Sequence, residues 1–190
     1  KSLMIAYWIL FIIFGFIALN ENQNSKSREY YLNLGIPWYF WILVFTFFIG
    51  FRYNIGTDWF PYHRLFEKIN SITFKELFDN ISYTENISYS VLLWISGKLD
   101  FGIFGANLFM GFLFSFLLII FCNHFSRPYL ALLISIPYII IVVGMGFGKQ
   151  GVALAFLMVS FLFLFKNKKF YFILFILIGA SFHQSLIIFL

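Results

Sequence analysis

A few polar side chains lie beside long apolar runs in this sequence, and their types could bind and transfer a phosphate-linked group. Arg52 ends one apolar run and Asp58 follows six residues later, Lys149 opens another run, and His183 lies late in the last one. Arginine and lysine bind phosphate oxygens, and histidine takes or gives a proton near neutral pH. The set therefore suits a transfer from a pyrophosphate-linked donor that needs no metal and no cofactor, since no Asp/Glu/His cluster has metal-ligand spacing.

The composition of the chain excludes a soluble globular protein, a disordered tail and a fibrous repeat. Hydrophobic residues make up 62% of its 190 residues and charged residues only 11%, against about 45–50% and about 25% in soluble domains. The formal net charge is +5, but the basic residues flank apolar runs, where membrane topology explains them better than nucleic-acid binding does. Cys122 is the single cysteine, which excludes a disulfide framework and a cysteine metal site.

Six long uncharged runs dominate the sequence, and each is about the length of a membrane span. A helix of about 20 apolar residues crosses a hydrocarbon core of ~30 Å. The sequence therefore predicts an all-α, polytopic integral membrane protein, a single membrane domain over 1–190. Because the chain begins with Lys1 and stops at Leu190 inside an apolar run, we expect a fragment of a longer protein. The expected spans are about 3–19, 35–51, 103–122, 129–147, 150–165 and 170–188.

The lysine cluster Lys166-Asn-Lys-Lys169 is the strongest signal for the orientation of these spans. Lysine and arginine are enriched in cytoplasmic loops, so the cluster should lie in the cytoplasm. Counting spans from it places the long loop 52–102 and the segment 144–149 outside. Arg52, Lys149 and the late residue His183 then lie near the same outer membrane face.

The outer loop 52–102 contains helical signals of its own. Thr73-Phe-Lys-Glu76 matches a capping box, which predicts a short helix starting there. Apolar residues before and after it recur at helical spacing. Two arrangements are open: short amphipathic helices on the membrane surface, or a small cap packed on the spans.

Two positions predict irregular backbone in the second half of the chain. Pro137 should kink the fourth span, because proline lacks a backbone donor and clashes with the preceding turn. The segment Gly144-Met-Gly-Phe-Gly148 is either an unwound stretch lining a cavity or an ordinary glycine-rich turn.

Each polar candidate also has a purely structural interpretation. Arg52 and Lys149 could be snorkelling anchors at helix ends, Asp58 could cap a helix that begins near Trp59, and His183 could be a packed, hydrogen-bonded histidine. An ionisable group within the membrane is nevertheless a functional hypothesis by default. No carboxylate follows Asp100, which disfavours an ion-coupled transporter.

Four short motifs, which together cover about residues 45–190, resemble those of a known protein family. In chain order they are Arg52-x-x-x-Gly56-Thr57-Asp58-x-x-x-Tyr62, Glu85-Asn86, Lys149-Gln150-Gly-Val-Ala153 and Phe182-His183-Gln-Ser185. Their order and spacing resemble those of the EpsG family of bacterial polysaccharide proteins, which are relatives of Wzy-type O-antigen and capsule polymerases. The chain departs from the family at two positions, with Lys149 in place of an arginine and Asn86 in place of a proline.

The resemblance implies an enzyme of exopolysaccharide biosynthesis, a membrane glycosyltransferase-type polymerase. It would join oligosaccharide repeat units carried on undecaprenyl pyrophosphate, at the outer side of the bacterial inner (plasma) membrane. Chain-length regulators and flippases would be its candidate protein partners. The alternatives are another lipid-linked sugar transferase or ligase, an exporter or flippase component without glycosyl transfer, and a non-catalytic scaffold.

The resemblance also implies roles for individual residues. Arg52 and Lys149 would hold the pyrophosphate leaving group, and His183 would be the base for the acceptor hydroxyl. Asp58 would orient Arg52 or the sugar. The remaining expected substrate-binding residues are Tyr62, Glu85 and Gln150.

Overall fold

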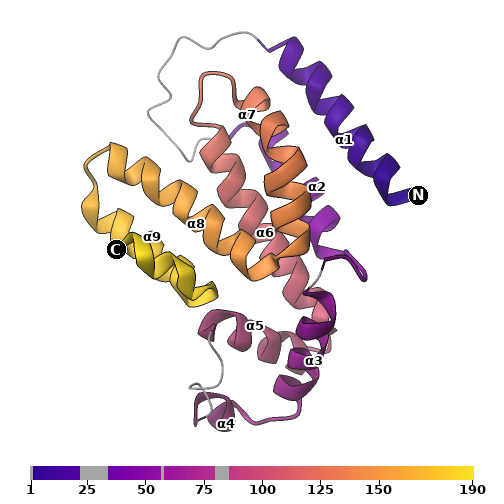
Figure 1. Cartoon of the computed structure of the whole chain (residues 1–190), viewed down its shortest axis with the longest axis vertical. Coiled ribbons are helices and arrows are strands. Elements are labelled where there is room, and N and C mark those ends of the chain that lie inside the picture. The colour runs from indigo at the N-terminus through magenta and orange to yellow at the C-terminus, as the bar shows by residue number, and fades with distance from the viewer. Residues whose placement is uncertain (1, 22–33, 57, 80–85) are drawn as a thin grey trace.

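The computed structural model describes residues 2–21, 34–56, 58–79 and 86–190, and over these ranges the chain forms helices and no strand. The predicted all-α class is therefore confirmed for the described part of the chain. Figure 1 shows a bundle of longer helices with a group of shorter ones, α3, α4 and α5, at one end.

The apolar helices of the bundle lie close to the predicted runs. Among the described residues, α6 and α8 are long and apolar enough to cross a membrane, and the other apolar helices are shorter. A count of about six spans therefore stays a prediction. The helices are α1 (Ser2–Leu19), α2 (Ile36–Gly50), α6 (Gly102–Cys122), α7 (Pro128–Ser135) continued by η2 (Ile136–Gly144), α8 (Gly148–Phe165) and α9 (Lys169–Phe182).

Helix α6 lies at the centre and packs against both α2 and α8. Small residues let α2 and α6 approach closely. A Cβ atom added at Gly50 would lie 2.8 Å from the Cα of Leu108, and one added at Gly111 would lie 2.9 Å from the carbonyl oxygen of Thr46. Small residues at such contacts are typical of helix packing in membranes, where burial of apolar surface gives little drive for association.

Helix α1 is joined to the N-terminus of α7 by polar contacts. The Glu21 carboxylate accepts hydrogen bonds from the backbone N–H groups of Tyr129 (3.1 Å) and Leu130 (3.2 Å). Arg127 donates from Nη2 to the carbonyl oxygen of Ala18 at 2.6 Å. A carboxylate at this position satisfies first-turn donors and complements the helix dipole, so these contacts hold α1 beside α7.

The irregular backbone predicted around Pro137 and Gly144 is confirmed. Helix α7 ends at Ser135 and the chain continues as the π-helix Ile136–Gly144, which ends just before the break at Phe147 that precedes α8. Because Pro137 cannot donate a backbone hydrogen bond, the regular α-helical ladder is interrupted there.

The last long helix ends earlier than the span expected over about 170–188. Helix α9 ends at Phe182, His183 adopts an extended conformation (φ −154°, ψ 118°), and the short 3-10 helix η3 (Gln184–Phe189) follows. The His183 side chain accepts the backbone N–H of Ser185. This local bond competes with the α-helical ladder and starts a new helix instead.

The helices of the segment 52–102 form a cap packed on the bundle rather than separate surface helices. They are α3 (Trp59–Asn70), α4 (Phe74–Asp79) and α5 (Ile87–Lys98), and α5 packs against both α3 and α6. The capping box is confirmed, since Thr73 N–H donates to the Glu76 carboxylate at 2.7 Å and Glu76 N–H donates to Thr73 Oγ1 at 3.3 Å. Trp94 Nε1 donates to the carbonyl of Ile72 at 3.1 Å, which fixes α5 against the start of α4.

Candidate functional site

Arg52 lies just after α2 and is buried, with 5% of its surface exposed. Its Nη1 donates to the main-chain carbonyls of Gly144 (3.1 Å) and Met145. These carbonyls lie at the end of η2, where helix carbonyls lack partners within the helix. Arg52 therefore points into the protein and joins α2 to the break before α8, which excludes a snorkelling anchor.

Gly148 makes room for the contact between Arg52 and the segment 144–148. A Cβ atom added at Gly148 would lie 2.8 Å from Nη2 of Arg52. The glycine-rich segment is therefore more than an ordinary turn, because its backbone receives a buried cation at close range.

Asp58 occupies the N-cap position of α3, but its side chain makes no capping hydrogen bond. Its Oδ2 instead accepts a hydrogen bond from the hydroxyl of Tyr62 at 2.9 Å. Asp58 also acts electrostatically on Arg52. The structural interpretation of Asp58 as a helix cap is thus right about its position and wrong about its side chain.

Lys149 points into the same cluster from the first turn of α8. Its Nζ lies 5.1 Å from the ring centroid of Tyr62 and 5.4 Å from that of Tyr89. An ammonium within about 6 Å of an aromatic face is attracted by the ring quadrupole. The ammonium of Lys149 therefore lies over the two aromatic rings of Tyr62 and Tyr89, which disfavours a role as an isolated anchor.

Tyr89 belongs to this cluster and was not among the predicted residues. Its side chain is 1% exposed and its ring centroid lies 5.2 Å from that of Tyr62. The sequence carried one weak signal for it, an aromatic residue in the helix that follows Glu85-Asn86. Its position against Tyr62 and Lys149 depends on how α3, α5 and α8 pack.

Burial controls the protonation of these groups. It lowers the pKa of Arg52 from its ordinary value, whereas the Asp58 carboxylate favours its charged form. Burial raises the pKa of Tyr62, with a further contribution from Asp58, and burial also raises the pKa of Tyr89. Both phenols therefore stay protonated at neutral pH and can donate hydrogen bonds.

His183 lies at the junction of α9 and η3, where its Nδ1 is 2.7 Å from Ser185 Oγ. This junction is tied to the cap, since Ser181 Oγ of α9 lies 2.7 Å from Ser88 Oγ of α5, one residue before Tyr89. The structure therefore connects the end of α9 to the helix that carries Tyr89.

Two of the expected substrate-binding residues, Gln150 and Glu85, are not part of the described cluster around Arg52. Gln150 is exposed in the first turn of α8. Glu85 lies outside the described residues. The structure thus brings Arg52, Asp58 and Lys149 together with Tyr62 and leaves the roles of Gln150 and Glu85 as predictions.

An open pocket of about 490 Å³ lies between α3 and the start of α6. Two of its aromatic walls, Tyr53 and Trp59, directly follow Arg52 and Asp58 in the sequence, and their rings meet edge to face at 5.5 Å. The lining is Tyr53, Trp59, Phe60, His63, Arg64, Ile103 and Phe104. Cavities of this size accommodate small organic ligands.

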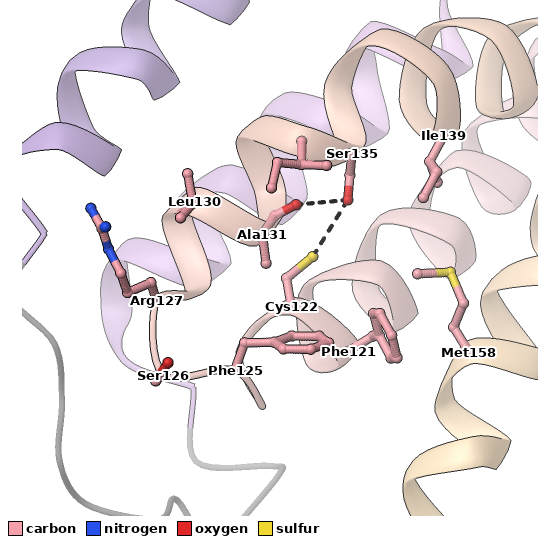
Figure 2. Close-up of a pocket in the computed structure, with 11 residues that line it drawn as sticks. Phe121, Cys122, Phe125, Ser126, Arg127, Leu130, Ala131, Ser135, Ile139 and Met158 are labelled. Carbon is pink, nitrogen blue, oxygen red and sulfur yellow. Dashed lines mark hydrogen bonds between the residues drawn. The ribbon is translucent and has the colours of Figure 1, made fainter.

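A second pocket, of about 430 Å³, lies where α6 ends and α7 begins, at the opposite end of α6 from the cap (Figures 1 and 2). In it, Cys122 Sγ lies 3.9 Å from Ser135 Oγ, while Arg127 extends away from the other lining residues. None of the predicted site residues lines it. Its lining is mostly apolar, so the candidate site is the cluster around Arg52.

The all-helical architecture and the two long apolar helices α6 and α8 indicate an all-helical protein with membrane-helix character. The model of the EpsG family matches residues 35–190, which is most of the chain, and the chain belongs to the EpsG family. No curated protein and no solved structure matches it. The resemblance recognised from the four motifs is thereby confirmed, and family membership indicates a role in polysaccharide biosynthesis.

Proposed function

We propose that this chain polymerises oligosaccharide repeat units, carried on undecaprenyl pyrophosphate, into a surface polysaccharide at the outer face of the bacterial inner membrane. The observation that carries the proposal is the meeting of Arg52 and Lys149, which are far apart in sequence, in one cluster with Asp58 and Tyr62. Two cations at one site suit a pyrophosphate leaving group.

The proposed topology has about six spans with the lysine cluster Lys166–Lys169 in the cytoplasm. The end of α2 and the starts of α6 and α8 lie at one end of the bundle, next to the cap, while the α8–α9 turn lies away from the cap (Figure 1). This arrangement supports a cap and a cation cluster at the outer membrane face.

In the proposed reaction, the acceptor sugar hydroxyl attacks the anomeric carbon of the lipid-linked donor. The bond between the anomeric carbon and the phosphate oxygen breaks, and undecaprenyl pyrophosphate leaves with the bonding electron pair. The hydroxyl proton passes to His183, while Lys149 and Arg52 stabilise the negative charge on the leaving group. Sugar rings of the repeat unit would occupy the aromatic pocket beside Trp59.

Replacing His183 tests this mechanism. In the full-length protein reconstituted with lipid-linked repeat units, His183→Ala should lower the rate of polymer formation by about 10²–10⁴-fold, the usual contribution of one general base. His124→Ala, in the turn after α6, is the matched control and should leave the rate unchanged. Polymer of normal length and rate from His183→Ala would remove this residue from the mechanism.

The cation cluster also suits a second function, because it could guide the same anionic lipid across the membrane without a chemical step. Liposomes that contain the protein and labelled repeat units separate the two. Longer saccharides support the polymerase, whereas movement between leaflets with no new glycosidic bond supports an exporter or flippase component.

A further inference from the structure

Two polar groups in the cation cluster are buried and have no protein hydrogen-bond partner among the described residues. They are Nε of Arg52 and the hydroxyl of Tyr89. Their side chains are 5% and 1% exposed. A buried donor without a partner is costly, and buried polar groups are almost always hydrogen-bonded, so such a pair at one site calls for an explanation.

The neighbouring groups narrow the chemistry of the missing partner. Arg52 uses Nη1 on two main-chain carbonyls, and the hydroxyl of Tyr62 donates to Asp58. The donors of this cluster without a protein partner among the described residues are the Arg52 Nε–H and the Tyr89 hydroxyl, and the ammonium of Lys149 lies over the Tyr89 ring. All three are donors. A ligand with several acceptor oxygens and a negative charge suits them, whereas a cation does not.

We propose that Tyr89 is a substrate-binding residue whose hydroxyl donates, together with Nε of Arg52, to an oxygen of the pyrophosphate that Lys149 neutralises. This inference rests on the proposed function, since it names the group of the lipid-linked donor that the cluster holds. It assigns to Tyr89 a task that the paired hydroxyl of Tyr62 does not perform.

Because Tyr89 lies on α5, an anion bound by its hydroxyl is also linked to the end of α9. Ser88, its neighbour, is joined to Ser181 on α9 by a hydrogen bond of 2.7 Å, two residues before His183. An anion held by Tyr89 is thereby fixed relative to the helix end that carries the proposed base.

The experiment measures binding of inorganic pyrophosphate to the purified full-length protein in lipid nanodiscs by titration calorimetry. Tyr89→Phe removes only the hydroxyl and keeps the ring beneath Lys149. A hydrogen bond to a charged group that is lost in this way should weaken binding roughly tenfold or more. Tyr138→Phe, at a tyrosine that is 66% exposed, is the matched control and should bind as the wild type does.

Equal affinity of Tyr89→Phe and wild type would overturn the inference, because it would mean that a trapped water satisfies the hydroxyl. Absence of pyrophosphate binding by the wild type would overturn it as well. A polymer assay on the same samples separates this outcome from failure of the proposed function. Weaker pyrophosphate binding by Tyr89→Phe together with a wild type that makes no polymer would reject the polymerase and keep the anion site.

A labelled tyrosine tests the contact without relying on the stability of a variant. 3-Fluorotyrosine placed at position 89 should give a ¹⁹F resonance that shifts on addition of pyrophosphate. The same label at position 138 should not shift. An unchanged resonance at position 89, under conditions where pyrophosphate binds, would contradict the assignment.

Discussion

Gly56 lies directly against Gly146, with a separation that leaves no room for a side chain. A Cβ atom added at Gly56 would lie 2.7 Å from the carbonyl oxygen of Gly146 and 2.8 Å from its Cα. Gly56 also has a φ of +87°, in the region that favours glycine. The loop after α2 therefore rests on the segment before α8, and this contact brings Arg52 beside Met145 and Lys149 into the cluster.

Gly56→Ala should destabilise the protein and reduce its activity. The left-handed backbone conformation alone costs about 1–3 kcal/mol for a residue with a Cβ, and the clash with Gly146 adds to it. Gly146→Ala is a matched control, because a Cβ added at Gly146 meets no atom within 4 Å. Thermal unfolding and polymer synthesis measure both variants, and equal effects would show that the two loops do not touch as described.

Arg52→Lys should weaken the junction between α2 and α8 even though it keeps the positive charge. Lysine lacks the planar fork of arginine, so the carbonyls of Gly144 and Met145 would lose a donor, at about 1–3 kcal/mol. Arg64→Lys, at an exposed arginine of the cap, should change the free energy of unfolding by less than about 0.5 kcal/mol. A chemical denaturation series compares the two. An Arg52→Lys variant as stable as the wild type would assign the arginine to ligand contact alone.

Lys149→Arg should retain polymer synthesis, because arginine keeps the charge and stacks on aromatic faces. Lys149→Gln should reduce synthesis by at least about tenfold, since one charge–phosphate interaction is lost. Lys98→Gln is the control, because Lys98 also lies over an aromatic ring, that of Trp94 at 5.7 Å, but at the C-terminal end of α5. The assay is the rate of chain elongation, and a Lys149→Gln variant with the wild-type rate would remove Lys149 from the site.

The two buried tyrosines should make the protein less stable in alkali. Burial raises the pKa of Tyr62 and Tyr89 above their ordinary value. Above about pH 10, these residues ionise in the unfolded chain while the folded chain keeps them protonated. Stability is therefore fully present below about pH 10 and falls as pH rises further.

Replacing both tyrosines by phenylalanine should make this alkaline decline shallower. The measurement is the unfolding temperature between about pH 8 and pH 11, with Tyr138→Phe as the control for an exposed tyrosine. If the double variant and the control lose stability equally over this range, the two phenols do not differ in pKa between the folded and unfolded chains.

Local features of the sequence predicted most of the helices. The apolar runs became helices because continuous apolar stretches favour them, and the capping box at Thr73 formed because both of its partners lie within one helical turn. Pro137 disturbed its helix because the missing donor belongs to the residue itself. Such effects act over a few neighbouring residues and can be read without a tertiary fold.

Other features depended on long-range packing. The end of α9 was missed because the bond between the His183 ring and the Ser185 backbone competes with the helix at a place where the apolar pattern continues. Tyr89 was missed because its importance arises only when α5 packs against α3 and Lys149 of α8 reaches both tyrosine rings.

The sequence by itself determined the class of the protein, its apolar helices, its family motifs and the short list of polar residues near the helix ends. The tertiary structure decided which of these residues meet. Arg52 finds its acceptors 92 and 93 residues away, on carbonyls that are available only where η2 ends. No local pattern encodes that pairing, because it requires the loop after α2 to contact the glycine-rich segment before α8.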